Sequence, residues 1–222
     1  MKLYSYIVTH DTGFAPNPFH GLSTLACCKP SVRRSIGRAV TAAIEAKQSI
    51  GEYWIVGLSP RDRGRGNKVI FIMKVDKALA FDKYWNGYPG KQPKVESARW
   101  EERCGDNIYR PLKSGEFEQL PSFHSLNYAK QDWRPDREHM KTDLSGEYVL
   151  LSKHFLYFGS KAICLPNELK ELIVGRGCRC NYENESEIHE RFRKWVRTLK
   201  GGRKPYVPTS LRDREQPKKD CQ

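Results

Sequence analysis

The stretch "LACCKPSVRR", residues 25–34, combines several residue types that commonly do chemistry in one short segment. Its adjacent cysteines, Cys27 and Cys28, supply thiols that can bind metals or act as nucleophiles. They are followed by Pro30, a residue favoured in the first turn of a helix. The segment therefore suggests three alternatives: a metal site, a redox site, or the start of a helix that holds an anion.

The helix-start alternative is favoured by the charges around the proline. The first N–H groups of a helix have no partners and carry partial positive charge, so they attract anions. Lys29 precedes the helix predicted over residues 30–48, and Arg33 and Arg34 lie in its first turns. We therefore expect these three side chains to bind phosphate.

The cysteine pattern does not favour a metal site. Zinc sites usually contain C-x₂₋₄-C pairs, whereas Cys178 and Cys180 form a tighter C-x-C with no histidine at a usual offset. A site assembled in three dimensions from Cys27, Cys28, Cys178 and Cys180 is an open alternative, but buried or incidental thiols are expected. The sequence predicts no metal and no cofactor.

A second polar segment, "CGDNIY" at residues 104–109, is predicted to read a base. Asp106 and Asn107 offer hydrogen bonds to base edges, and Tyr109 offers a stacking face. The alternative is an Asx turn between strands.

Two further segments could approach a ligand closely. The rigid proline-rich loop "FAPNPF" carries Asn17, predicted to read the base, and Phe19, predicted to stack on it. In "VGRGCR", glycines on both sides of Arg176 allow close backbone approach, so this arginine is predicted to assist in holding phosphate.

Candidates for acid–base chemistry are scattered. His124 and His154 lie in segments that resemble strands, where either could be a general base, although a structural role is favoured for each. The sequence shows no Ser-His-Asp order, nucleophile elbow, P-loop or dinucleotide fingerprint. If the chain is an enzyme, the candidate acid–base residues are Asp11, Asp106 and His154.

Composition favours an anionic partner. The 222 residues include 39 Lys and Arg against 26 Asp and Glu, which gives a formal net charge of +13. Nucleic acid is the commonest partner of such a chain, and phosphorylated small molecules come next. A basic surface without a specific partner is the alternative.

The order of elements predicts an α+β fold. Strand patterns at residues 2–11, 52–60 and 68–81 surround the predicted helix at 30–48, and the clearest amphipathic helix spans residues 185–200. The polar segment 129–147 is expected to be a mobile loop. We predict a mixed or barrel-like (PUA-like) sheet with flanking helices, in one domain over residues 1–199, followed by a basic disordered tail at 200–222.

No apolar run approaches the length of a membrane span, and the first residues enter a strand pattern rather than the apolar region of a signal peptide. The odd count of 7 cysteines argues against a disulfide framework. The expected location is the cytoplasm, where cysteines stay reduced, with no membrane partner.

Several motifs together resemble the second nucleotide-modification-associated domain family of bacteria and phages. They are "YSYIVTHDTGFAPNPFHGLSTLACCKPSVRR", "CGDNIYRP", "VLLSKHFLYFG" and "GRGCR". The strands "YWIVGLSP" and "KVIFIMKVDKALAFDKYW" also resemble those of PUA, ASCH and EVE-like barrels. The resemblance implies a link to modified bases in DNA.

Three functions are compatible with these features. The leading hypothesis is a protein that recognises a modified base or nucleotide in bacterial or phage DNA. The alternative is an enzyme that catalyses a step of base or nucleotide hypermodification, which turnover would reveal. The third is an interaction protein that docks onto other DNA-modification or defence proteins, which would have no affinity of its own for nucleic acid.

Overall fold

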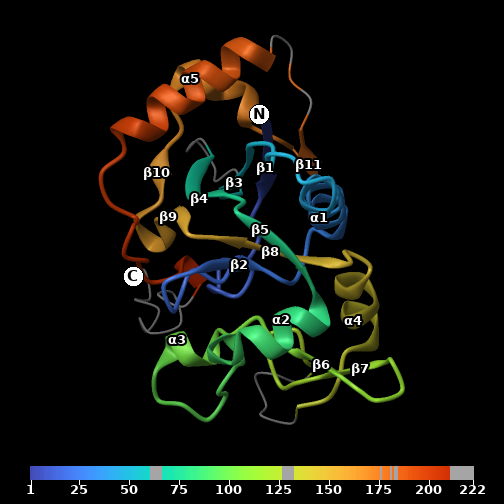
Figure 1. Cartoon of the computed structure of the whole chain (residues 1–222). Helices are drawn as coiled ribbons and strands as arrows, with labels where there is room; N and C mark the ends of the chain where they lie inside the picture. The colour runs from blue at the N-terminus through green and yellow to red at the C-terminus, as the bar shows by residue number, and fades with distance from the viewer. Residues whose placement is uncertain (61–66, 127–132, 176, 181, 183–184, 211–222) are drawn as a thin grey trace, which may run out of the picture. The chain divides into compact units, whose positions relative to one another are not determined.

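The computed structural model describes residues 1–60, 67–126, 133–175, 177–180, 182 and 185–210. The chain divides into two compact units, each drawn from separate stretches of sequence (Figure 1). Unit 1 comprises Met1–Thr12, Glu52–Lys74 and His154–Gln222, and unit 2 comprises Gly13–Gly51 and Val75–Lys153. The single domain over residues 1–199 stays a prediction.

Among the described residues, unit 1 contains a six-stranded mixed sheet in the order β10-β4-β3-β1-β11, with β9 also paired to β4. Only the β1–β3 pair in this sheet is parallel, and the other described pairs are antiparallel. The strands are β1 (Lys2–Ile7), β3 (Tyr53–Leu58), β4 (Lys68–Lys74), β9 (His154–Tyr157), β10 (Ile163–Cys164) and β11 (Cys178–Arg179).

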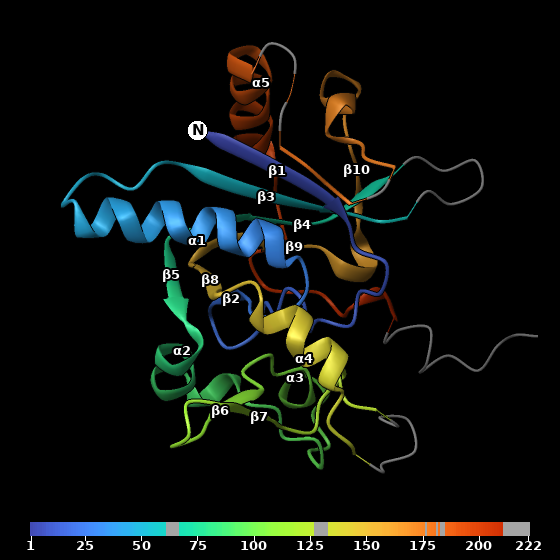
Figure 2. The ribbon, with the colours of Figure 1, turned by 90° about the vertical axis from the view of Figure 1, so that its right-hand side faces the viewer.

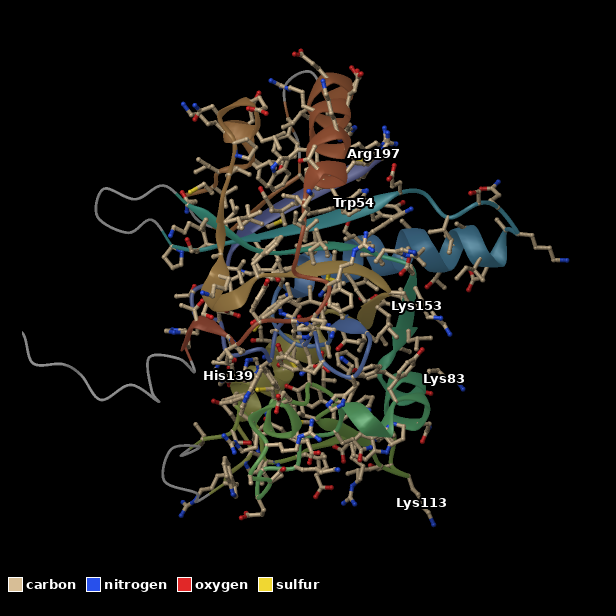
Figure 3. All side chains as sticks on the ribbon, turned by 90° about the vertical axis from the view of Figure 1, so that its left-hand side faces the viewer. Trp54, Lys83, Lys113, His139, Lys153 and Arg197 are labelled. Carbon is tan, nitrogen blue, oxygen red and sulfur yellow. The ribbon has the colours of Figure 1, made fainter. Side chains whose placement is uncertain are left out.

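The core of unit 1 forms where α5 (Glu185–Thr198) packs on this sheet. Ile188 and Phe192 of the helix are fully buried, as its predicted apolar face requires. The ring of Trp54, labelled in Figure 3, meets Phe192 edge to face at 5.4 Å between centroids. Burial of each large side chain contributes about 1.5–3 kcal/mol. Two 3₁₀ helices, η3 (Gly159–Lys161) and η4 (Asn167–Leu172), complete the unit.

Within its described residues, unit 2 contains a three-stranded antiparallel sheet in the order β2-β8-β5 and a separate two-stranded pair, β6 with β7. The strands are β2 (Ser23–Leu25), β5 (Lys77–Ala80), β6 (Tyr109–Pro111), β7 (Phe117–Gln119) and β8 (Tyr148–Ser152). The helices are α1 (Pro30–Glu45), α2 (Phe81–Gly87), η1 (Pro89–Lys91), α3 (Trp100–Arg103) and α4 (Arg137–Leu144).

Helix α1 lies against β5 and β8 (Figure 2). Its buried face carries Val32, Ile36 and Val40 at helical spacing. Gly37 lies on the same face. A side chain does not fit there, because an added Cβ would lie 2.3 Å from the ring of Tyr148. The helix begins at Pro30 as predicted, because proline lacks only an N–H that would have no partner there.

The α+β class, the mixed sheet and the flanking helices are confirmed. The described strands form open sheets rather than a closed barrel. In the part of the chain that the structure describes, no helix is long and apolar enough to span a membrane.

The mobile loop predicted over residues 129–147 is wrong where the structure describes it. Helix α4 occupies part of this segment, and the Asp136 side chain caps it by accepting from the N–H groups of Glu138 and His139 at 3.1 and 3.0 Å. Met140 and Leu144, four residues apart, pack against the unit 2 core. A polar surface therefore concealed an ordinary capped helix.

The first residues of the predicted tail make backbone hydrogen bonds with unit 1. The carbonyl of Gly202 accepts from the N–H of Tyr157, and that of Val207 accepts from Ser160, both at 2.8 Å. These two bonds connect residues 202 and 207 to unit 1, and the basic disordered tail over residues 200–222 stays a prediction. Residues 211–222 lie outside the described part.

Candidate functional site

The turn between β2 and α1 presents a cysteine. Cys28 and Lys29 both adopt left-handed backbone conformations, with φ of 61° and 44°, which are uncommon for residues other than glycine. The turn separates the two thiols: Cys27 is fully buried, whereas Cys28 is partly exposed. A sharp strand-to-helix turn is the way in which several enzyme folds present a nucleophile.

The Cys28 thiol faces a histidine and an aspartate. Its Sγ lies 3.5 Å from Nε2 of His124, in the turn that follows β7. The other ring nitrogen, Nδ1, lies 2.7 Å from Oδ2 of Asp143, in the last turn of α4. A thiol, an imidazole and a carboxylate thus stand in a row, an arrangement that can support covalent catalysis.

Asp143 is fixed from three sides. Its carboxylate accepts the backbone N–H of Cys28 at 2.6 Å and the hydroxyl of Tyr109 at 2.7 Å, besides its bond with His124. Its side chain is 1% exposed, whereas that of His124 is 13% exposed. The aspartate is therefore a buried support, and the ring it holds has access to solvent.

The electrostatics of the pair follow from this arrangement. Burial disfavours the charged ring of His124, but hydrogen bonds to Asp143 and Cys28 outweigh it and raise the pKa of His124 to about 10. Burial likewise opposes ionisation of Asp143, but the bond from His124 outweighs it and lowers the pKa of that carboxyl. At neutral pH the site therefore contains a carboxylate and a protonated ring.

Two aromatic rings enclose His124. Phe14 lies 4.6 Å and His139 lies 4.8 Å from it, between ring centroids. His139, labelled in Figure 3, is exposed on α4. These contacts restrict the imidazole to the orientation that its two hydrogen bonds require.

Part of the same cluster could hold a metal ion. Ligand atoms of Cys27, His124 and Asp143 lie within 4.8 Å of one another. However, burial raises the pKa of the Cys27 thiol well above its usual range, and a thiol must lose its proton to bind zinc. Both nitrogens of His124 also already have partners. The geometry favours a nucleophile–base pair over a metal centre.

Asp106 lies in a separate buried network of unit 2. It is fully buried and accepts from the hydroxyl of Thr24 at 2.8 and 2.9 Å and from that of Tyr84 at 2.6 Å. Asn107 donates to the carbonyls of Tyr84 and Tyr88 at 3.2 and 3.0 Å. These bonds tie loops together.

Asn17 joins the same part of unit 2. Its amide donates to the carbonyl of Cys104 at 2.6 Å, and its Oδ1 accepts from Nζ of Lys91 at 2.7 Å. Phe19 is buried with its ring 4.9 Å from that of Trp100. The structure thus brings Asn17, Asp106 and Asn107 into the interior, and their contact with a base stays a prediction.

The predicted phosphate-binding residues occupy different surroundings. Arg33 is fully buried and donates to the carbonyls of Cys28 at 2.8 Å and Tyr148 at 2.7 Å, so it supports the turn that presents Cys28. Arg34 reaches the carbonyl of Ser145 at 2.9 Å. Lys29 is the residue that precedes α1. Phosphate binding by these residues stays a prediction.

The remaining candidates are distributed over both units. Asp11 and His154 belong to unit 1, so the three proposed acid–base residues are split between the units. Arg176 lies outside the described residues. Tyr109 does reach the site, through its bond to Asp143 rather than as a stacking face.

One comparison with known proteins is informative. The family model for nucleotide modification associated domain 2 matches residues 1–212. The chain belongs to this family. Membership suggests a role in DNA modification systems and an interaction with nucleic acid or nucleotide. No curated protein and no solved structure is similar enough to count as a match. For this member of the nucleotide modification associated domain 2 family, a more specific function must therefore be argued from the geometry of its side chains.

Proposed function

We propose that the chain is an enzyme of nucleotide or DNA base modification in which the Cys28 thiol is the nucleophile. The observation that carries the proposal is the row formed by Cys28, His124 and Asp143, with contacts of 3.5 and 2.7 Å. Family membership supports a base or nucleotide as the substrate class. This is the enzyme hypothesis, with Cys28 and His124 in the roles first considered for Asp11, Asp106 and His154.

The chemistry of the pair is covalent catalysis. In the reactive state the sulfur of Cys28 is a thiolate that faces the Nε2–H group of the protonated His124 ring. The sulfur forms a bond to an electrophilic carbon of the substrate, and the electron pair displaced from that carbon takes the proton from Nε2. In the reverse step the sulfur leaves with its bonding electrons and Nε2 accepts a proton. Asp143 positions the ring and stabilises its charge throughout.

The decisive experiment compares wild-type protein with Cys28→Ser. Each is expressed in a bacterial host, and nucleosides from digested DNA and from the nucleotide pool are separated by mass spectrometry. A new nucleoside should appear with wild type and fall by about 10³-fold or more with the variant, because a serine hydroxyl beside this histidine is a much weaker nucleophile.

Cys164→Ser is the matched control, since Cys164 is an exposed cysteine of unit 1. It should leave the yield of the new nucleoside unchanged. Equal yields from wild type and Cys28→Ser would contradict the proposal. Stoichiometric zinc in purified protein, lost with His124→Gln, would assign the cluster to a metal instead.

Recognition of a modified base in DNA is the second candidate, favoured by the net charge of +13. The resemblance to PUA, ASCH and EVE-like pockets and a contact with other bacterial or phage modification or defence proteins belong to this candidate. It predicts a preference for modified DNA that survives high salt, because attraction to phosphate alone weakens as salt rises.

A further inference from the structure

Unit 1 contains a cavity of about 210 Å³ that the chemistry at Cys28 does not use. It lies where β1 and β3 end and β4 begins, beside η3. Because β1 and β3 are parallel, their carboxyl ends meet at this edge of the sheet. Ligands of sheets with parallel strands commonly bind at such an edge.

A fixed carboxylate lines the cavity. Asp11 is 5% exposed, and its side chain accepts the N–H of Thr209 at 2.8 Å and the hydroxyl of Tyr157. A carboxylate oxygen accepts more than one hydrogen bond. Asp11 is therefore a carboxylate held in a fixed position at the wall of the cavity.

The rest of the lining is mixed in character. Lys68, the first residue of β4, contributes the one full positive charge among the described lining residues. Val8, Ile70 and Ala162 give apolar surface, and serines and threonines also line the cavity. A lining with one carboxylate and one ammonium disfavours a simple polyanion. It favours a ligand with a hydroxyl donor, an apolar face and a single anionic group.

The volume of the cavity limits which ligands it can accommodate. Sites for whole drug-sized ligands usually have volumes of about 300–1,000 Å³, so this cavity accommodates only part of such a molecule. Double-stranded nucleic acid, with its bases stacked, cannot enter a hollow of this volume. A free nucleotide is compatible with this volume if its nucleoside part enters the cavity and its phosphate stays at the rim.

We propose that the unit 1 cavity binds the nucleoside part of a free nucleoside 5′-monophosphate. A sugar hydroxyl donates to Asp11, the base lies against Val8 and Ile70, and the phosphate meets Lys68. The site is independent of the reaction at Cys28.

The test is calorimetric titration of the full chain with nucleoside 5′-monophosphates and, separately, with inorganic phosphate. At least one monophosphate should bind at concentrations where inorganic phosphate gives no heat. Ala162→Trp, which fills the cavity, should weaken that binding by more than about tenfold. Lys68→Gln should weaken it about five- to tenfold through loss of a charge-assisted contact.

Lys74→Gln is the matched control, because it removes a lysine from the other end of the same strand. It should leave the affinity unchanged. Equal binding of inorganic phosphate and monophosphates, or an unchanged affinity in Ala162→Trp, would overturn the proposal. Substitution of Asp11 would also remove its bonds with Thr209 and Tyr157 and could unfold the unit. The test therefore depends on Ala162→Trp, whose folding is checked by thermal unfolding. Cys28→Ser should bind as wild type does, so failure of the Cys28 proposal and failure of this one can be told apart.

Discussion

Among its described residues, unit 2 contains two buried carboxylates that have matching support and different surroundings. Asp106 accepts the hydroxyl of Tyr84 at 2.6 Å, and Asp143 accepts that of Tyr109 at 2.7 Å. Each also accepts a backbone N–H from the segment that follows β2, where Asp106 meets Ala26 and Asp143 meets Cys28. The same arrangement, a buried carboxylate that accepts from a tyrosine hydroxyl and a backbone N–H, thus occurs twice along the segment that follows β2.

The two carboxylates differ in their third partner. Asp106 meets the hydroxyl of Thr24 inside the core, and burial raises the pKa of its carboxyl. Asp143 meets the ring of His124, which lowers its pKa despite burial, and that ring touches a partly exposed thiol. The same support therefore anchors loops when its partners are neutral and enclosed. It positions a reactive pair when one partner can take up a proton and has access to solvent.

The comparison is tested most strongly by Asp143→Asn. An amide keeps the size of the side chain but cannot hold a protonated ring, so turnover to the new nucleoside should fall by about 10⁴-fold. The pKa of His124, followed by NMR of its ring, should drop from about 10 toward its ordinary value.

The NMR readout separates positioning from stability, since loss of stability alone would not move the ring titration. Asp136→Asn is the control, because Asp136 pairs with the exposed His139 rather than with His124. Unchanged titration of His124 in Asp143→Asn would contradict the role assigned to the aspartate.

Asp106→Ala should have the largest effect on folding. It removes the acceptor of the Tyr84 hydroxyl and of the Ala26 N–H, and it leaves the Thr24 hydroxyl with a longer bond of 3.5 Å to the carbonyl of Asn17. Each buried orphan group costs about 1–3 kcal/mol, so the free energy of unfolding in urea should fall by about 3–5 kcal/mol. The fraction that remains folded should keep its Cys28 reactivity toward iodoacetamide, whereas loss of that reactivity would place Asp106 in the reactive site.

Local signals in the sequence predicted much of this architecture. Pro30 marks the start of α1, and the apolar face through Ile188 and Phe192 marks α5. Both depend on short-range rules, namely the geometry of a first helical turn and the spacing of apolar residues. The sequence also marked Cys28 and His124 as chemically able residues.

Their meeting could not be predicted, because it depends on contacts between distant segments. His124 lies 96 positions after Cys28, and Asp143 lies in the helix mistaken for a polar loop. Asp136 at the cap and Met140 four residues further on are the signals that could have revealed that helix. The burial of Asp106 and Arg33 also depends on tertiary packing that the sequence does not reveal, and their predicted ligand contacts stay predictions.

The pH dependence of the free energy of unfolding should distinguish the surroundings of His124 from those of Lys91. The raised pKa of His124, about 10, means that its stabilising effect is complete below pH 6.5 and declines as pH rises toward 10. Burial lowers the pKa of Lys91 to about 7, so its effect has the opposite sign and stability rises above pH 7. Each slope reaches at most about 1.4 kcal/mol per pH unit, so the two should nearly cancel in wild type.

Urea unfolding between pH 7 and pH 8, where a thiol with the ordinary pKa of about 8.5 is still mostly protonated, measures this balance. His124→Gln should make stability rise with pH, and Lys91→Met should make it fall. Slopes of the same sign in both variants would show that one of these two groups does not titrate in the folded state as its surroundings imply.

His139→Ala should have the smallest effect on the reactive pair. Its ring lies 4.8 Å from that of His124 and makes no hydrogen bond with it in the described structure. A ring contact of this kind contributes about 0.5–1 kcal/mol, so turnover should fall only about two- to fivefold. His154→Ala, which removes an exposed histidine of unit 1, should change nothing. A loss of turnover as large as that of Cys28→Ser would contradict this prediction. It would indicate that the exposed ring of His139 takes part in proton transfer beside His124.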